Sequence, residues 1–341
     1  MNTNLPKVLH ELCGRPMLAY VLDACRQAGL QKLYVVIGYG AEKVKKRFSQ
    51  ADDILWVEQR QQKGTAHAVM CCKPYLENFQ GEILVLCGDG PLIRAETLQT
   101  LIKAHQAEQT AATLATAVLD DPTGYGRIIR DANGTIQGIV EHSDCTPEQL
   151  AIREVNPSYY IFDNKVLFEA VDKIKPDNVK NEYYLTDVLS VIIAAGRKVG
   201  AVTAVRPEEA IGVNSRDQLG QTSKIMQRRI QRKLMNSGVT IVDPDNTWID
   251  ARAQIGADTV IEPFVYIHGE AKIGCNVNIG AGTIMANPIG QEMASWTKIG
   301  DGCSIGAGAT LIAPLDVKNG THIPPGAVVA NENAEQFVSN D

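Results

Sequence analysis

The 341-residue sequence contains no apolar run that approaches the roughly 18 residues needed to cross a membrane. Its first residues, Met1 to Pro6, form neither a basic nor an apolar segment, so no signal peptide is expected there. Positive charge is not in excess either, because the formal net charge is −6. These absences predict a protein that neither spans a membrane nor presents a broad nucleic-acid surface, although one phosphorylated ligand can still be held by a local basic residue.

Paired cysteines are also missing. The sequence has 8 cysteines, none of which forms a C-x-x-C pair, and Cys71 and Cys72 are adjacent. With no secretory signal expected, reduced thiols in the cytoplasm are the simplest interpretation, and a sulfur-ligated metal is not expected.

Residues 1–213 alternate between apolar runs and helical patterns. The length and the apolar content of 45% fit a globular protein of about two domains. Continuous apolar runs are typical of strands covered on both faces, and their alternation with helices predicts a doubly wound α/β domain with a mostly parallel sheet. The expected strands are 33–37, 83–87, 112–118 and 158–162.

A different pattern begins at residue 215. Cationic and amide side chains are interleaved with apolar ones through residue 237, which predicts an amphipathic connector helix. From about residue 240, an aliphatic residue recurs every six positions, and glycine follows several of them. The repeating residues are Ile249, Ile255, Ile261, Ile267, Ile273, Ile279, Met285, Ile299, Ile305, Leu311, Val317, Ile323 and Val329.

A six-residue period is typical of a left-handed parallel β-helix, in which three hexads make one triangular coil. Each aliphatic side chain is expected to point inward and to stack on the next coil, while the glycines allow tight corners. The repeats suffice for about four coils. The period fails between Ala286 and Lys298, where Pro288 and Trp296 predict a loop that projects from a corner.

Gly88 and Asp89 follow the expected strand 83–87. Ligands of such sheets bind outside the carboxyl ends of the strands, and an aspartate there suits Mg²⁺, which prefers carboxylate and phosphate oxygens. The alternative is that Asp89 caps the helix expected after Pro91. Lys7 offers a charge to a phosphate, although a solvated surface lysine is the commoner case.

Two further segments carry groups that suit a nucleotide sugar. Gln59, together with Gly64 and Thr65, places amide and hydroxyl groups ahead of a helix, as base or sugar recognition requires, though any strand–turn–helix segment looks alike. The segment 123–127 is rich enough in glycine for its backbone to approach a ligand closely, with a plain turn as the alternative.

Seven strings occur in an order that resembles one known family. They are LPKVLH (5–10), QRQQKGTAHA (59–68), CGDGPLI (87–93), DDPTGYGRI (120–128), GIVEH (138–142), NEYYLTD (181–187) and GVNSR (212–216). Together they resemble the N-acetylglucosamine-1-phosphate uridyltransferase domain of the bacterial bifunctional GlmU family. The resemblance covers nearly all of residues 1–235, and the hexapeptide repeats that follow strengthen it.

The resemblance implies a reaction and a set of roles. The family joins UTP and N-acetylglucosamine 1-phosphate into UDP-N-acetylglucosamine and pyrophosphate, for cell-wall precursors. It implies that Asp89 and Asn214 hold Mg²⁺ and that Lys7 contacts the nucleotide phosphates. It also implies uracil recognition by Gln59, Gly64 and Thr65, sugar binding by Gly126, Glu141 and Asn156, and substrate contacts by Gly88 and Asn214.

The sequence departs from the family at its beginning. The family opens with a strand and a glycine-rich loop, LAAGxGTRM, and Met1 stands where the final methionine of that motif is expected. The loop supplies main-chain donors to the triphosphate, and the first strand of such a sheet is central. A start assigned too late, a degenerate remnant and a deliberate truncation are three explanations. We favour the first, and we expect little uridyltransferase activity from the chain as written.

Smaller departures concern the sugar pocket and the repeats. Asn156-Pro157-Ser158 replaces the Asn-x-Gly of the family, so one wall of the pocket is expected to change shape, and Gly90 replaces a typical valine, which is expected only to loosen a turn. The repeats lack the K-A-G-H-L-x-Y-like stretch whose histidine serves acetyl transfer in the family. Their two histidines, His268 and His322, are expected on exposed faces. Acetyltransferase activity is therefore not expected, and the short β-helix is expected to form trimers.

We therefore predict a Rossmann-like nucleotidyltransferase domain over 1–214, a connector helix over 215–238, a left-handed β-helix over 239–331 and a tail over 332–341. The predicted function is Mg²⁺-dependent UDP-N-acetylglucosamine synthesis by a cytoplasmic homotrimer. One alternative is another sugar-1-phosphate nucleotidyltransferase. A second is a catalytically inactive trimeric binding or scaffold protein, which the absent glycine-rich loop favours. A hexapeptide acyltransferase is disfavoured by the missing histidine motif.

Overall fold

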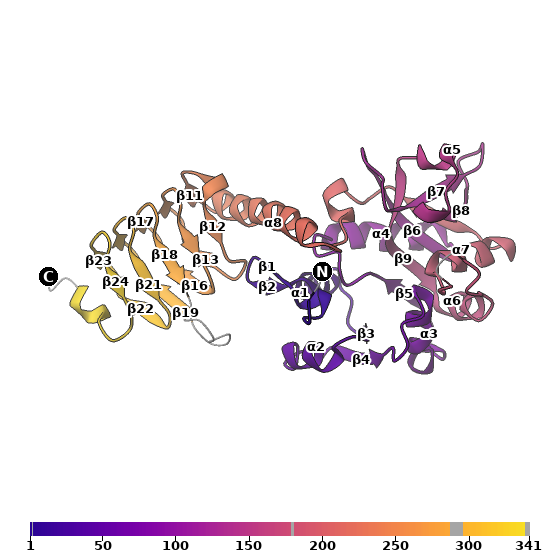
Figure 1. Ribbon diagram of the computed structural model, residues 1–341, viewed down its shortest axis with the longest axis horizontal. Coiled ribbons are helices and arrows are strands. Elements are labelled where there is room, and N and C mark those ends of the chain that lie inside the picture. Colours follow the sequence, from indigo (N-terminus) through magenta and orange to yellow (C-terminus); the bar gives the residue numbers. More distant parts are fainter. Residues whose placement is uncertain (2, 179–180, 287–295, 338–341) are drawn as a thin grey trace. The chain divides into compact units, whose positions relative to one another are not determined.

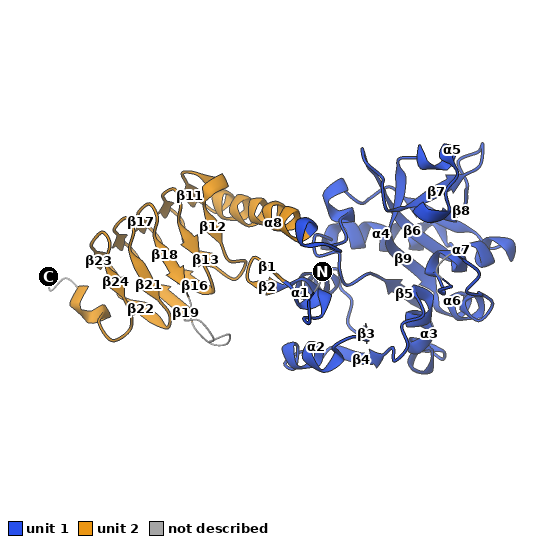
Figure 2. Cartoon of the chain, in the orientation of Figure 1, with its two compact units in different colours: residues 1–10, 16–218 blue, residues 11–15, 219–341 orange. Residues whose placement is uncertain are grey.

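The computed structural model describes residues 1, 3–178, 181–286 and 296–337, whose helices and strands are labelled in Figure 1. It divides the chain into two compact units (Figure 2). The N-terminal unit comprises Met1–His10 and Pro16–Gln218, and the C-terminal unit comprises Glu11–Arg15 and Leu219–Asp341.

The N-terminal unit alternates strands and helices. Its strands are β3 (Leu33–Ile37), β4 (Ile54–Glu58), β5 (Glu82–Val85), β6 (Ala112–Val118), β7 (Gly126–Arg130), β8 (Ile136–Val140), β9 (Glu154–Asp163) and β10 (Val199–Val202). Its helices are η1 (Lys7–Leu9), α1 (Met17–Gln27), α2 (Ala41–Arg47), α3 (Thr65–Leu76), α4 (Ala95–Glu108), η2 (His142–Asp144), α5 (Pro147–Leu150), α6 (Asn164–Val171), α7 (Leu185–Ala194) and η3 (Pro207–Ala210). All four predicted strands are present. However, β5 ends two residues before the predicted end, so the residues up to Asp89 leave the sheet.

The main sheet has six strands in the order β10-β6-β9-β7-β8, with β5 also paired to β9. Strand β9 is antiparallel to β5, β6 and β7, and β7 is antiparallel to β8, whereas β10 and β6 are parallel. The prediction of a mostly parallel sheet is therefore wrong. For the pair β7 and β8 the physical reason is the short turn between them, closed by Asp131 N donating to Thr135 O at 2.9 Å. Such a turn joins antiparallel strands, whereas parallel strands need a long crossover.

Helices cover both faces of this sheet, as an α/β domain requires. Along β6, Leu114 packs in the cluster that contains α3, α6 and α7, while the next residue, Ala115, packs in the cluster that contains α1 and α4. Along β9, Tyr160 and Ile161 are divided between the same two clusters. Successive side chains of a strand point to opposite faces, so each strand contributes to two cores. Strands β3 and β4 form a separate parallel pair.

The C-terminal unit contains most of α8 (Arg216–Asn236), the strand β1 (Glu11–Leu12), the first residue of its partner β2 (Arg15–Pro16), and a stack of short strands. These are β11 (Thr240–Ile241), β12 (Trp248–Ile249), β13 (Gln254–Ile255), β14 (Val260–Ile261), β15 (Tyr266–Ile267), β16 (Glu270–Ile273), β17 (Asn278–Ile279), β18 (Ile284–Ala286), β19 (Trp296–Ile299), β20 (Ser304–Ile305), β21 (Thr310–Ile312), β22 (Leu315–Val317), β23 (His322–Ile323) and β24 (Val328–Val329), with the short helices η4 (Pro244–Asn246) and η5 (Ala334–Phe337).

The repeat strands form three parallel sheets, in the orders β11-β14-β17-β20-β23, β12-β15-β18-β21-β24 and β13-β16-β19-β22. Ile255 pairs with Ile273, 273 − 255 = 18 residues on, which is one coil of three hexads. Every repeating aliphatic residue is between 0% and 9% exposed. The predicted β-helix is therefore confirmed, with two sheets of five strands and one of four.

The glycines that directly follow the repeating aliphatic residues have a different role from the one predicted, whereas others such as Gly282 and Gly308 do have a positive φ, of 69° and 68°. A Cβ on Gly280 would lie 2.5 Å from the backbone nitrogen of Ala307, and one on Gly306 would lie 2.3 Å from that of Pro325. Neither glycine has a positive φ. These positions therefore need glycine because the next coil approaches closely, and not because the backbone turns tightly.

The strands on either side of the interrupted period stay paired in register. Ile273 pairs with Ile299, which is 299 − 273 = 26 residues on, eight more than one regular coil. The predicted loop is partly wrong, because Trp296 to Lys298 lie in β19 and pair with β16. Its central part, residues 287–295 including Pro288, lies outside the described residues.

Candidate active site

Three polar side chains from distant parts of the N-terminal unit meet beyond the end of β5. The Lys7 ammonium donates hydrogen bonds to Asp89 Oδ2 and to Asn214 Oδ1, the latter with 2.7 Å between nitrogen and oxygen. The Lys7 side chain is 36% exposed and the Asp89 side chain 23% exposed. These residues stand 82 and 207 positions from Lys7 in the chain, so only the folded structure brings one cation to both oxygens.

The backbone fixes Asp89 at this place. Val213 N donates to Asp89 O at 2.9 Å, which joins the loop after β5 to the segment that carries Asn214. The alternative prediction, that Asp89 caps the next helix, is wrong, because α4 begins at Ala95 with Arg94 as its N-cap. The Asp89 carboxylate faces Lys7 instead.

Asn214 is oriented by the start of α8. Gln218 Oε1 accepts hydrogen bonds from Asn214 N at 2.7 Å and from Ser215 N at 3.0 Å, while Ser215 Oγ accepts from Gln218 N at 3.1 Å. This reciprocal arrangement is a capping box. Asn214 Nδ2 donates to Gly212 O at 3.4 Å, which leaves its Oδ1 directed at Lys7. Sequence analysis missed Gln218, although its spacing after Ser215 carries the capping signal.

Lys7 itself lies in the turn η1. Leu9 N donates to Pro6 O at 2.9 Å and His10 N donates to Lys7 O at 3.2 Å. Leu9 and His10 are buried, so the backbone of the turn is anchored. The four-carbon stem of a lysine nevertheless leaves its ammonium able to move.

Asp89 and Asn214 fit a hard divalent cation. Both offer oxygen, and the two oxygens flank a single point, because one nitrogen reaches both of them. Mg²⁺ is commonly held by one or two carboxylates together with waters and substrate phosphates. The described part of the chain holds no group of three or more His, Cys, Asp or Glu side chains that could bind a metal. The residues therefore suit an ion that shares its ligands with a phosphate and not one enclosed by protein.

Gln59, Gly64 and Thr65 lie together at the start of α3. Gln59 Nε2 donates to Gly64 O at 3.0 Å. Gly64 has a φ of 108°, and a Cβ there would lie 2.5 Å from Tyr183 O, so glycine is required. Thr65 Oγ1 accepts from Leu185 N at 2.9 Å. The structure thus brings these three predicted residues together beside the segment 183–185.

Gly126, Glu141 and Asn156 form a second group. Gly126 and Asn156 are partners in the pairing of β7 with β9, and a Cβ on Gly126 would lie 3.5 Å from Glu141 Oε2. The Thr186 hydroxyl donates to Glu141 Oε1 at 3.3 Å. Because Thr186 directly follows the residue that contacts Thr65, one short segment connects the two groups.

The amide of Asn156 is held by its own chain. Its Nδ2 donates to Tyr160 Oη at 2.6 Å, and its Oδ1 accepts from Ser158 N at 3.0 Å. Ser158 has a φ of 68°, in the left-handed region where the family carries glycine. Sequence analysis missed Tyr160, because an aromatic residue in an apolar strand carries no polar signal. A changed pocket wall at 156–158 stays a prediction.

Gly90 has a packing role that sequence analysis did not give it. A Cβ there would lie 2.7 Å from Tyr159 Oη, which donates to Glu209 O at 2.8 Å. Burial raises the pKa of Tyr159 well above its ordinary value, so the hydroxyl stays protonated and able to donate. Gly88 lies against the apolar side chains of Leu18 and Val8. The surroundings of Gly88 are therefore apolar, and only its place next to Asp89 in the chain supports the predicted substrate contact.

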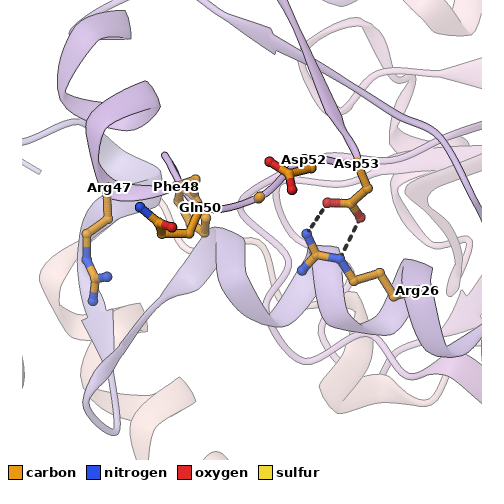
Figure 3. Close-up of a pocket in the computed structure, with 7 residues that line it drawn as sticks. Arg26, Arg47, Phe48, Gln50, Asp52 and Asp53 are labelled. Carbon is orange, nitrogen blue, oxygen red and sulfur yellow. Dashed lines mark hydrogen bonds and ion pairs between the residues drawn. The ribbon is translucent and has the colours of Figure 1, made fainter.

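An open hollow of about 530 Å³ lies apart from these residues (Figure 3). It is lined by Arg26, Arg47, Phe48, Gln50, Ala51, Asp52 and Asp53. Two hydrogen bonds of 2.7 Å join the Arg26 guanidinium to the Asp53 carboxylate. The hydrogen bonds from Arg26 hold the pKa of Asp53 below its ordinary value. Sequence analysis predicted a role in substrate binding for none of the residues that line this hollow. Arg26 and Asp53 bind each other, so we do not assign the hollow to the candidate active site.

Other features of the described residues bear on the predictions. All cysteine thiols are free of disulfides. No helix among these residues combines the length and apolar character that crossing a membrane requires. In the β-helix, the His268 ring stacks on Tyr266 with 6.0 Å between centroids, and His322 is exposed.

Comparisons with known proteins bear on the family to which the chain belongs. The family model described as "Nucleotidyl transferase" matches residues 2–250. The chain is 37% identical to the "Bifunctional protein GlmU" of Geobacillus sp. (strain WCH70), over 99% of this chain and 92% of that protein. It is 42% identical to the protein of the same name from Listeria welshimeri, over 98% of this chain and 74% of that protein.

A solved structure extends the comparison of the fold. The crystal structure of a UDP-glucose pyrophosphorylase complexed with UDP-glucose matches with a TM-score of 0.53 and 17% identity, over 66% of this chain and 91% of that one. At this identity the match concerns the fold alone, and it supports the α/β nucleotidyltransferase architecture.

Proposed function

Since the chain belongs to the nucleotidyl transferase family, and within it to the family of bifunctional GlmU proteins, we propose that it forms UDP-N-acetylglucosamine and pyrophosphate from UTP and N-acetylglucosamine 1-phosphate. The observation that carries this proposal is the meeting of Lys7, Asp89 and Asn214 at one point beyond β5. A cation, a carboxylate and an amide oxygen at the end of a strand are what a triphosphate-binding site needs.

The chemistry asks for positioning and charge neutralisation more than for covalent help. A phosphate oxygen of the sugar phosphate attacks the α-phosphorus of UTP, and pyrophosphate leaves. In our proposal the Lys7 ammonium neutralises phosphate charge, while Asp89 and Asn214 present their oxygens to a divalent cation. We propose Mg²⁺ as that cation, because it prefers such oxygens and binds phosphates with them. When bound, it neutralises the triphosphate and aligns the reacting phosphate.

The two other groups supply recognition. We assign the uracil to Gln59, Gly64 and Thr65, where the Tyr183 backbone approaches Gly64 so closely that only glycine fits. We assign the sugar to Gly126 on β7, Glu141 directly after β8 and Asn156 on β9, which lie close together. The segment 183–186 contacts both groups, so it can hold the two substrates in a fixed relation.

We further propose that the β-helix assembles the protein as a homotrimer. One of its faces carries an outward row of residues in register, namely Trp248, Tyr266, Ile284, Thr310 and Val328. Tyr266, Ile284 and Val328 are 41%, 42% and 57% exposed. The corresponding row on another face is polar, namely Gln254, Lys272, Lys298 and Asp316. An apolar row on one face favours association through that face. Sedimentation should give three times the chain mass of 37.0 kDa, and a monomer would contradict the proposal.

Two narrower expectations accompany the main proposal. The cysteines without disulfides fit a reducing compartment, and we place the reaction in the cytoplasm. We expect no acetylation of glucosamine 1-phosphate, since neither histidine of the β-helix lies in a stretch like the one that the family uses. An assay with acetyl-coenzyme A checks this, and acetyl transfer would contradict it.

Pyrophosphate release tests the main proposal. The chain is assayed with Mg²⁺, UTP and N-acetylglucosamine 1-phosphate, both as it stands and with a glycine-rich LAAGxGTR segment joined before residue 1. We expect the extended form to be the more active. A panel of other nucleoside triphosphates and sugar phosphates tests the alternative of a different sugar nucleotidyltransferase. No activity in either form, with no UTP binding, would favour the inactive scaffold.

A further inference from the structure

The position of the Lys7 ammonium between Asp89 and Asn214 has a consequence for metal binding. Its nitrogen lies 2.7 Å from Asn214 Oδ1 and is hydrogen-bonded to Asp89 Oδ2 as well. A Mg²⁺ ion held by the same oxygens needs about 2.0–2.1 Å to each of them. The ammonium and the ion therefore require the same space. Like charges at such a distance also repel each other.

We propose that Lys7 is a placeholder cation that occupies the divalent metal site until nucleotide binds. This inference rests on the proposed function, in which Asp89 and Asn214 are the metal ligands. While the nucleotide is absent, the ammonium neutralises the Asp89 carboxylate and keeps both oxygens facing one point. The metal must displace it to bind.

The local structure allows this exchange. The backbone of Lys7 is anchored by η1 and by buried Leu9, whereas its side chain is 36% exposed and has the flexible four-carbon stem of a lysine. The backbones of the ligands are fixed independently of Lys7. The Asp89 backbone is held by its bond to Val213, and the Asn214 backbone by Gln218. The lysine can therefore leave without moving the backbone that carries the two oxygens.

Nucleotide binding gives the displaced ammonium a new partner. Phosphate oxygens accept hydrogen bonds from lysine, so a metal ion that arrives with a triphosphate replaces the contact that Lys7 loses. A metal ion that arrives alone leaves the ammonium with two lost hydrogen bonds and a like charge close by. Lys7 thereby couples metal affinity to nucleotide occupancy, so that the protein binds the ion weakly alone and strongly with UTP.

The test measures Mn²⁺ binding by electron paramagnetic resonance of the free ion, first without nucleotide. We expect Lys7→Met to bind Mn²⁺ at least about tenfold more tightly than the unsubstituted protein, because one competing charge is removed. Lys43→Met is the matched control. It also removes one positive charge, from a lysine whose ammonium contacts Asn4 O at 3.2 Å, and should change the affinity less than about twofold. Lys7→Gln serves as a second neutral variant, and circular dichroism checks that each variant folds.

A second measurement adds UTP. The affinity of the unsubstituted protein for Mn²⁺ should rise more on UTP addition than that of Lys7→Met, a difference that a merely structural role of Lys7 would not produce. Equal Mn²⁺ affinities of Lys7→Met, Lys7→Gln and the unsubstituted protein would overturn the placeholder role. If Asp89→Asn in the Lys7→Met background still binds Mn²⁺ as tightly, the metal site of the proposed function fails instead.

Discussion

The two units of this protein reach their structures by opposite routes. In the C-terminal unit, each aliphatic residue stacks on one 18 or 26 residues away, and the same contact is repeated from coil to coil. In the N-terminal unit, the contacts that make the site join residues 82 and 207 positions apart, and each occurs once. Repetition makes the β-helix a sum of similar local contributions. The active site depends instead on single contacts that are not part of a repeating pattern.

This difference predicts that damage to one unit leaves the other intact. Ile279→Ala would open a cavity in the row of Ile261, Ile279 and Ile305, which are at most 2% exposed. We expect the free energy of unfolding of the C-terminal unit to fall by about 2–5 kcal/mol. Urea unfolding in a Trp56→Phe background measures it, because both remaining tryptophans lie in that unit. Val242→Ala, at an exposed position, should cost less than roughly 0.5 kcal/mol. A loss of UTP binding by Ile279→Ala would contradict the independence of the units.

A substitution in the active site of the N-terminal unit should lower the activity without changing the stability of the C-terminal unit. In the form extended by the LAAGxGTR segment, Asp89→Ala removes the carboxylate at the meeting point and should lower the rate of pyrophosphate release by roughly 10²–10³-fold. The unfolding of the C-terminal unit should not change. Asp52→Ala, in the hollow of Figure 3, is the matched control and should keep full activity. If Asp89→Ala releases pyrophosphate at the rate of the unsubstituted protein, the active site does not include Asp89.

Gly90→Val tests whether single contacts also limit packing in the N-terminal unit. The added side chain collides with Tyr159 Oη, so we expect a loss of about 1–3 kcal/mol in the free energy of unfolding. Tyr159→Phe removes the colliding oxygen, and its ring carbons would lie at an ordinary contact distance of 3.7 Å or more. The double variant should therefore lose less unfolding free energy than the two single variants lose when their losses are added. Strict additivity in urea unfolding would show that the collision does not occur.

The smallest expected effect on stability concerns an ion pair between β7 and β9. Arg130 donates hydrogen bonds of 2.7 and 2.8 Å to Glu154, and these lower the pKa of Glu154. A lowered pKa means that this stabilisation is complete above the unfolded value of about 4.3 and is lost as the pH falls through the folded value. Glu154→Gln should therefore cost about 1 kcal/mol at pH 7 and much less at about pH 3. Unfolding followed by Trp56 fluorescence in a Trp248→Phe, Trp296→Phe background checks this at both pH values.

A matched control uses an exposed ion pair of the same unit. Lys165 and Glu169 are 3.9 Å apart, with side chains 85% and 51% exposed. Glu169→Gln should change the stability by less than about 0.5 kcal/mol at either pH. A cost of Glu154→Gln that is the same at pH 7 and at pH 3 would mean that the charge of Glu154 is not what ties the strands.

Sequence reasoning served the two units unequally. Every residue of the hexad period is buried in the β-helix, because the inward position is set by local spacing, but the period did not predict the buried Val265, Val277 and Leu315. It misjudged the glycines that directly follow the repeating aliphatic residues, since the approach of the next coil is not visible in the period. In the N-terminal unit, alternation predicted the four strands but gave the wrong direction for β9. The short turn between β7 and β8, at 131–135, contradicts the assumption of helical crossovers.

The site shows the same limit. Ordered motifs identified Asp89, Asn214 and Lys7, but Tyr160 and Thr186 were missed, because their roles come from the partners that folding gives them. Gly90 looked like a loosened turn until the structure placed Tyr159 against it.

The sequence by itself determined the periodic part of this protein and its family, because both depend on residue types at short or ordered spacings. Only the tertiary structure decided that β9 runs antiparallel, that the Lys7 ammonium lies between Asp89 and Asn214, and that Gly90 makes room for Tyr159. These are contacts between distant residues, and their geometry follows from the packing of the whole unit and not from any local pattern.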